Sequence, residues 1–146
     1  MESTVKEIRG LYFSPTHTTQ RSVDAMGAAL AERLGVPYAA DALTLPRQRQ
    51  DARAYDAQTL VIVGAPVYGG RLPAVFVRAM EQVRGGGALA VAAVTYGNRA
   101  YDDAMLELQR LLEGAGFRVV AGCAFLGEHS MTARVAPGRP DAQDLD

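Results

Sequence analysis

Five short apolar runs recur along the chain, and most are separated by segments with an apolar residue at every third or fourth position. The runs predict strands, at residues 5–13, 36–42, 59–64, 88–94 and 118–125. The periodic segments predict helices, at residues 19–34, from Pro73 to the glycines at 85–87, and at 101–113. Strands that alternate with helices in this way indicate one α/β domain with a parallel sheet and right-handed crossovers.

Individual residues refine this pattern. Residues 59–64 are apolar with no interruption, as expected of a strand buried on both faces of a sheet. Pro37 has no N–H to donate to a ladder, so the second strand is expected at a sheet edge. The helix that follows Pro73 is expected to bury a stripe that ends at Val83. The polar residues 46–56 predict a loop or a surface turn of helix.

The length of 146 residues fits a single domain over residues 1–146. A hydrophobic content of 49% and a charged content of 21% are typical of a soluble globular protein. The net charge of −1 provides no electrostatic attraction for nucleic acid or an anionic membrane. No apolar run is long enough to span a bilayer, and the first residues lack a signal-peptide pattern. We therefore expect a cytoplasmic protein with neither nucleic-acid nor membrane partners.

The single cysteine, Cys123, excludes a disulfide within the chain. Cys123 lies in the last predicted strand, where we expect it to be a packed small side chain in a buried strand. The two histidines, His17 and His129, are too few and too far apart to indicate a metal site. No metal is therefore predicted.

Hydroxyl side chains crowd the turn between the first strand and the first helix. Four of the six residues from Ser14 to Thr19 are Ser or Thr, and His17 lies among them. Backbone N–H groups, hydroxyl donors and the positive end of a helix together suit a phosphate monoester. A helix cap needs only one such hydroxyl, so capping alone does not account for four. The turn therefore predicts a phosphate site.

Two further loops follow predicted strands and combine tyrosine with glycine. They read Gly64-Ala-Pro-Val-Tyr-Gly-Gly-Arg-Leu-Pro73 and Thr95-Tyr-Gly-Asn-Arg-Ala-Tyr-Asp102. The carboxyl ends of parallel strands meet at one edge of a sheet, where ligands bind at the change in strand order. A phosphate turn beside two aromatic, glycine-containing loops predicts a site for a planar ring with a phosphate tail.

The three loops, in this order, resemble those of the flavodoxin family. Ser14-Pro-Thr-His-Thr-Thr19 is similar to the family's phosphate loop, of pattern [ST]-x-T-G-x-T, and the other two loops to its ring-flanking loops. The resemblance covers about residues 5–126. It implies FMN as the cofactor and a flavodoxin-like, doubly wound α/β fold whose five parallel strands lie in the order 2-1-3-4-5. The function implied is that of an FMN-binding electron-transfer domain.

The resemblance also implies a set of cofactor-binding residues in the three loops. They are Ser14, Thr16, His17, Thr18, Thr19, Pro66, Val67, Tyr68, Gly69, Gly70, Thr95, Tyr96, Gly97, Asn98, Arg99, Tyr101 and Asp102. No catalytic residue is expected, because no nucleophile stands with a base and a group to orient it.

The implied roles differ among these residues. Tyr101 is expected to stack on the flavin ring, with Tyr68 or Tyr96 over another face or edge. Asn98 is expected to bond the pyrimidine edge, while the paired glycines let the backbone approach the ring. Arg71 or Arg99 near the ring would raise the flavin potential. Ordinary packing of the tyrosines, and solvent-facing arginines, remain open alternatives.

A closer resemblance is to the flavodoxin-like half of flavodoxin–ferredoxin fusion proteins of anaerobes. It rests on Val67-Tyr-Gly-Gly-Arg71, Tyr96-Gly-Asn-Arg-Ala-Tyr-Asp-Asp103 and Phe125-Leu-Gly-Glu-His-Ser130. It implies a redox partner protein of the ferredoxin type. Residues 128–146 hold two prolines and leave no room for a fifth covering helix. A piece of a longer protein, a partner on that face (which includes a homodimer) and an irregular tail all remain open.

Two features depart from the family. His17 stands where the family has Gly, and a left-handed backbone there is costly for a residue with a side chain. The chain is also nearly neutral, whereas flavodoxins are strongly acidic. Two other functions also stay open. One is an FMN-dependent NAD(P)H:quinone-type reductase, and the other is a flavin-free, flavodoxin-like binding module.

Overall fold

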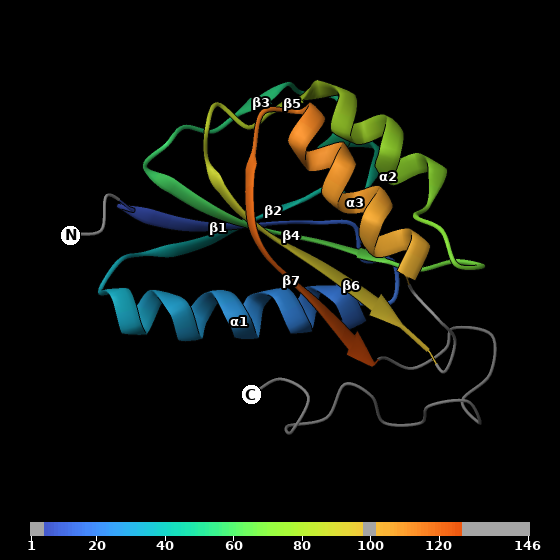
Figure 1. Cartoon of the computed structure of the whole chain (residues 1–146), viewed down its shortest axis with the longest axis horizontal. Coiled ribbons are helices and arrows are strands. Elements are labelled where there is room, and N and C mark those ends of the chain that lie inside the picture. Colours follow the sequence, from blue (N-terminus) through green and yellow to red (C-terminus); the bar gives the residue numbers. More distant parts are fainter. Residues whose placement is uncertain (1–4, 98–101, 127–146) are drawn as a thin grey trace.

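The computed structural model describes residues 5–97 and 102–126. Figure 1 shows a central sheet with α1 against one face and with α2 and α3 against the other. The main elements, in chain order, are β1 (Glu7–Tyr12), α1 (Thr18–Leu34), β2 (Tyr38–Ala42), β4 (Thr59–Pro66), α2 (Ala74–Ala79), β6 (Leu89–Tyr96), α3 (Asp102–Gly114) and β7 (Arg118–Leu126).

The sheet has five parallel strands in the order β2-β1-β4-β6-β7. Counted among the long strands alone, this is the order 2-1-3-4-5, so the predicted flavodoxin-like fold class is confirmed. The chain first moves outward from β1 to β2 and then returns to β4 on the other side of β1. Ligands of α/β sheets bind beyond the carboxyl ends of the strands at such a reversal, which here falls between β1 and β4.

Each face of the sheet buries its own apolar cluster. Leu11, Val63 and Phe76 belong to the cluster under α2 and α3, and Ile62 and Val23 to the one under α1. All five side chains are completely buried. The alternation of side chains along each strand supplies both clusters, because neighbouring residues of a strand face opposite ways.

Gly64 lets α1 lie close to the sheet at the carboxyl end of β4. A Cβ atom at this position would overlap side-chain atoms of Val23 and Thr19. The first two turns of α1 therefore rest directly on the end of β4. This contact brings the beginning of α1 to the carboxyl edge of the sheet.

The segment after Pro73 differs from the prediction. Helix α2 ends at Ala79 and is followed by a 3-10 helix, η2 (Met80–Gln82), and by a two-residue strand, β5 (Val83–Arg84). Val83, which was expected in a helical stripe, pairs instead with Arg53 of β3 (Arg53–Ala54). Val83 is buried in either arrangement, so its apolar character does not distinguish helix from strand. The polar segment 46–56 contains η1 (Pro46–Arg49), which agrees with the predicted surface turn of helix. It also contains β3, which was not predicted.

The expectation that β7 is a buried strand is wrong. Val120 is 56% exposed and the residues up to Gly122 are largely exposed, because within the described part of the chain β7 pairs only with β6 and forms the sheet edge. Cys123 is half-buried and packs against the cluster under α1, as expected of a small packed side chain. Residues 128–146, with the expectation of a missing covering helix, lie outside the described residues. Within the described ranges, no helix combines the length and apolar character needed to cross a membrane.

Candidate functional site

His17 sets the direction in which α1 begins. It is the N-cap of the helix and has a left-handed backbone, with φ 68° and ψ −2°. Among the described residues it is the only one other than glycine with a positive φ. Its N–H donates to the carbonyl of Ser14 at 3.2 Å, which closes the turn between β1 and α1. Residue 17 therefore has the conformation for which the family pattern has Gly.

Ser14 is buried and makes hydrogen bonds through both its backbone and its side chain. Its backbone N–H donates to Oγ1 of Thr44 at 2.9 Å, and its Oγ accepts from the N–H of Gln20, also at 2.9 Å. The hydroxyl thus satisfies one of the backbone donors that every helix leaves open in its first turn. Its own O–H remains available to a ligand. Thr44 was not singled out from the sequence, since it lies 30 residues away.

Three backbone donors at the start of α1 have no acceptor within the described residues. They are the amides of Thr16, Thr18 and Thr19. The Oγ1 atoms of Thr16 and Thr18 lie 3.5 Å apart, with Thr16 exposed and Thr18 buried. The helix behind them is 17 residues long, and its aligned peptide dipoles add positive potential at this end. The turn therefore offers an anion both N–H and O–H donors.

The loop after β4 folds into a tight hairpin. Tyr68 and Arg71 exchange backbone hydrogen bonds of 2.8 and 3.1 Å, and Gly69 and Gly70 between them have φ values of 59° and 81°. Two left-handed residues in a row form the primed turn that suits a two-residue hairpin. Among the described residues, a Cβ at either glycine would meet nothing within 4 Å, so the tip of the hairpin is not covered by that part of the chain.

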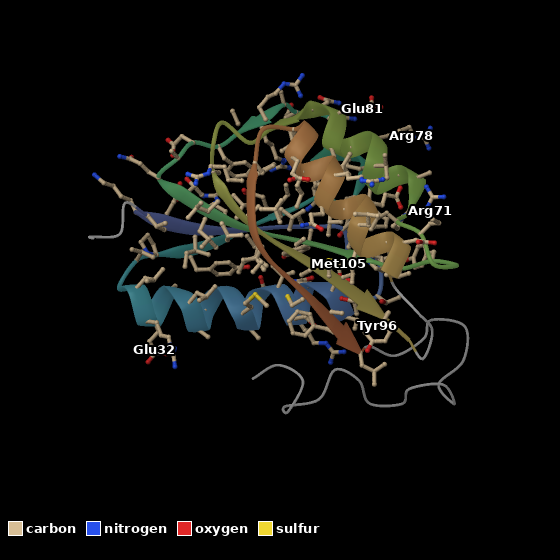
Figure 2. All side chains as sticks on the ribbon, viewed as in Figure 1. Glu32, Arg71, Arg78, Glu81, Tyr96 and Met105 are labelled. Carbon is tan, nitrogen blue, oxygen red and sulfur yellow. The ribbon has the colours of Figure 1, made fainter. Side chains whose placement is uncertain are left out.

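The hairpin lies beside the end of β6. The N–H of Val67 donates to the carbonyl of Thr95 at 2.9 Å, and Pro66 is the register partner of Thr95. Tyr68 is 47% exposed, and partial burial raises the pKa of its phenol. Figure 2 shows Arg71 and Tyr96 at the end of the molecule toward which β4 and β6 run.

Thr95 carries a buried hydroxyl without a partner. Its residue is 6% exposed, and Oγ1 makes no hydrogen bond within the described part of the chain. Thr95 follows Val91 and Ala93 on the face of β6 that packs toward α1. An unsatisfied buried hydroxyl costs free energy, so Thr95 offers a hydrogen-bonding group to any ligand that binds at this edge of the sheet.

A carboxylate of α3 holds the base of the hairpin. Glu107 accepts from Nε and Nη2 of Arg71, at 3.2 and 3.4 Å, and from the N–H of Leu72 at 3.1 Å. Burial alone raises the pKa of Glu107, but the hydrogen bonds from Arg71 and Leu72 and the charge of Arg71 lower it overall. Arg71 is 68% exposed and its charge is paired with Glu107. The sequence analysis did not single out Glu107.

Some predicted site residues fall outside the described ranges. Asn98, Arg99 and Tyr101 do so, and their roles stay predictions. Asp102 is the first residue of α3, and Gly97 follows directly after β6. Among the described residues, no group of three or more His, Cys, Asp or Glu side chains is arranged to hold a metal ion.

Comparison with known proteins finds similarity in structure only. No protein-family model matches the sequence, and no curated protein matches it either. A flavodoxin from Streptococcus pneumoniae matches with 18% identity and a TM-score of 0.60, over 82% of this chain and 83% of that one. Flavodoxin 2 from Bacillus cereus matches with 17% identity and a TM-score of 0.56, over 86% and 88%.

A flavoprotein from Lactobacillus acidophilus, solved in complex with FMN, matches with 11% identity. Its TM-score is 0.58, and the match covers 82% of this chain and 93% of that one. At such identities the similarity concerns the path of the backbone. Together with the observed strand order, it shows that this chain has the flavodoxin-like fold.

Proposed function

We propose that this chain is an FMN-binding electron-transfer domain of the flavodoxin type. The observation that carries the proposal is the set of amides at Thr16, Thr18 and Thr19 that have no acceptor within the described residues, at the start of α1 and at the carboxyl edge of the sheet. The open glycine hairpin and the unpartnered Thr95 hydroxyl lie at the same edge. The likeness to flavodoxins and to an FMN-bound flavoprotein also supports it.

The phosphate end of FMN suits the turn from Ser14 to Thr19. A phosphate monoester accepts several hydrogen bonds, and this turn supplies suitable donors in its three amides without an acceptor among the described residues and in the hydroxyls of Thr16 and Thr18. No Lys or Arg lies in this turn, so N–H and O–H donors and the helix dipole would supply the binding energy. Hydrogen bonds with Thr44 and Gln20 fix the position of Ser14, which lies at the beginning of this loop.

The ring end suits the hairpin and the end of β6. Gly69 and Gly70 present backbone without side chains, so a planar ring can approach the peptide groups themselves. The hydroxyl of Thr95 would pair with a polar edge of the ring or its chain. When bound, FMN supplies the one- and two-electron chemistry, while the chain binds it, orients it and limits its contact with water.

The direct test is a titration of the flavin-free protein with FMN, followed by flavin fluorescence. We expect saturable one-to-one quenching and weaker binding of riboflavin, which lacks the phosphate. Thr16→Val and Thr18→Val together should reduce the preference for FMN over riboflavin by about a hundredfold or more, since each hydroxyl bond to a charged group is worth about 1.5–3 kcal/mol.

Ser22→Ala is the matched control for this test. Its hydroxyl lies one turn further along α1 and already donates to the carbonyl of Thr18, so FMN affinity should not change. If FMN produces no quenching at all, the proposed function is wrong. Rapid oxidation of NADPH by the loaded protein in the presence of a quinone would indicate an FMN-dependent reductase instead.

We also propose an iron–sulfur protein of the ferredoxin type as the electron partner. The resemblance of residues 67–71 and 96–103 to the flavodoxin half of fusion proteins supports this partner. A ferredoxin mixed with the chemically reduced domain should lose its visible absorbance as its cluster is reduced. Transfer no faster than to a redox dye of the same potential would contradict the proposal.

A further inference from the structure

The glycine hairpin depends on contacts made at its base. Its two internal hydrogen bonds, between Tyr68 and Arg71, define the turn but do not attach it to the rest of the protein. A Cβ atom at Gly69 or Gly70 would meet no described residue within 4 Å, so packing at the tip does not fix the position of the turn. Glycine pairs are also the residues with the greatest backbone freedom. Anchors at the base must therefore set where the tip lies.

Two anchors lie at that base. On the side of β4, the N–H of Val67 donates to the carbonyl of Thr95. On the other side, Glu107 accepts hydrogen bonds from both the side chain of Arg71 and the backbone of Leu72. The second anchor is made by a single side chain. It ties the hairpin to α3, the helix that follows the loop after β6 along the chain.

The setting of Glu107 favours a local effect over a global one. It lines an open hollow of about 320 Å³ together with Arg71, Asp103, Leu106 and Arg110. Because the guanidinium of Arg71 is largely exposed, the ion pair itself contributes little to the stability of the fold. Its three directed hydrogen bonds nevertheless specify where residues 71 and 72 lie.

We propose that Glu107 is a positioning residue that holds the Gly69–Gly70 hairpin where a bound flavin ring meets it. This inference rests on the flavin site proposed above. The carboxylate does not itself contact the ring. It acts through Arg71 and Leu72, and it makes the position of the hairpin depend on the position of α3.

The test compares flavin affinity and amide exchange among variants of α3. We expect Glu107→Ala to weaken the binding of FMN and riboflavin by the same factor, about tenfold. Glu107→Gln keeps an oxygen for the Leu72 N–H and should weaken binding less. The equal factor separates this effect from the phosphate turn, whose variants change the FMN-to-riboflavin ratio. Amide hydrogen exchange at Leu72 should accelerate in the same order of variants.

Glu113→Ala and Glu113→Gln are the matched controls. Glu113 lies on the same helix, is exposed, and has no side-chain partner within the described residues. These variants should leave both affinities and the Leu72 exchange rate within about twofold of the starting protein. If Glu107→Ala does not fold, the comparison of Glu107→Gln with Glu113→Gln decides the question.

The outcomes separate the proposal from the proposed function. Faster exchange at Leu72 with unchanged flavin affinities would overturn the positioning role while leaving the flavin site intact. Unchanged exchange and unchanged affinities would overturn the anchor itself. If the starting protein binds neither flavin, the proposed function fails and the positioning role fails with it, whereas the exchange data still report whether Glu107 holds Leu72.

Discussion

His17 and Gly35, the two residues that bound α1, share one left-handed conformation, with φ values of 68° and 67°. At the C-terminal end this is the ordinary helix stop, and the N–H of Gly35 donates back to the carbonyl of Ala31. At the N-terminal end the same backbone is held by a residue with a side chain. That cost is about 1–2 kcal/mol for an L-residue in this region.

Substitutions at the two ends of α1 should change the free energy of unfolding in opposite directions. His17→Gly should raise the free energy of unfolding by about 0.5–1 kcal/mol, because relief of strain exceeds the added entropy of the unfolded glycine. His17→Ala keeps the strain and should give no gain. Gly35→Ala should lower the free energy by about 1 kcal/mol, although a Cβ there meets nothing within 4 Å. Urea denaturation measures all three.

A gain in His17→Ala equal to that in His17→Gly would contradict this account. It would mean that the imidazole itself is unfavourable, even though its Nδ1 lies 3.2 Å from Oε1 of Gln20.

The sequence predicted the fold from features that act locally. The apolar run at 59–64 and the glycine stop at Gly35 are consequences of burial and of backbone freedom, and both follow from residue type. The second strand lies at a sheet edge, as expected from Pro37, which directly precedes β2 and has no N–H to donate. Val83 and Val120 could not be placed in the same way. One is buried in a two-residue strand and the other exposed at an edge, and valine suits both.

In the candidate site too, the sequence predicted the residues with a local pattern and missed their distant partners. Ser14, Thr16 and Thr18 stood out because hydroxyl residues crowd one helix start. The partners that hold the site in place are Thr44 and Glu107, which lie 30 or more residues away from the groups they bind. A single carboxylate on the polar face of a helix has no distinguishing pattern along the chain. Only the folded arrangement shows that it meets Arg71 and Leu72.

The hydrogen bond from the Leu72 N–H to the Glu107 carboxylate should weaken at low pH. Its pKa is lowered in the folded protein, so the anchor contributes above the ordinary glutamate value of about 4.3. It is lost as the pH falls through the folded pKa. Arg71, Asp103 and Arg110 line the same hollow, and the Arg71 charge favours the ionised form. The amide chemical shift of Leu72 should therefore titrate with a midpoint below that ordinary value.

Glu107→Gln is the control for this titration, because glutamine has no acidic proton in this range. The Leu72 shift should then be flat down to the onset of acid unfolding. A Leu72 midpoint above the ordinary glutamate value would show that burial outweighs the contacts from Arg71 and Leu72.

Cys123 should react slowly in the folded protein. Burial raises the pKa of its thiol to about 11, and the thiolate is the reactive form. At about pH 8 the thiolate fraction is then about two hundredfold lower than that of a free cysteine with a pKa of about 8.5. Reaction with an aromatic disulfide reagent should be slower than in urea by about that factor. Equal rates would mean that the thiol at this sheet edge is open to solvent.

Thr95→Val should have opposite effects on stability and on flavin binding. In the flavin-free protein, the substitution removes a buried hydroxyl that has no partner within the described residues, while it nearly preserves the shape of the side chain. The free energy of unfolding should therefore rise, by about 1 kcal/mol, because an unsatisfied buried polar group is costly.

In the presence of FMN the same change should weaken binding. If the ligand supplies the missing hydrogen bond, its loss lowers FMN affinity by about five- to tenfold. Thr59→Val is the contrasting variant, since the Thr59 hydroxyl already lies 3.4 Å from Oδ1 of Asp56 and 3.5 Å from Oε1 of Glu7. It should destabilise the protein and leave flavin affinity unchanged. A Thr95→Val protein that is more stable and binds FMN as tightly as before would place the ligand elsewhere on this edge, because the buried hydroxyl would then serve no bound group.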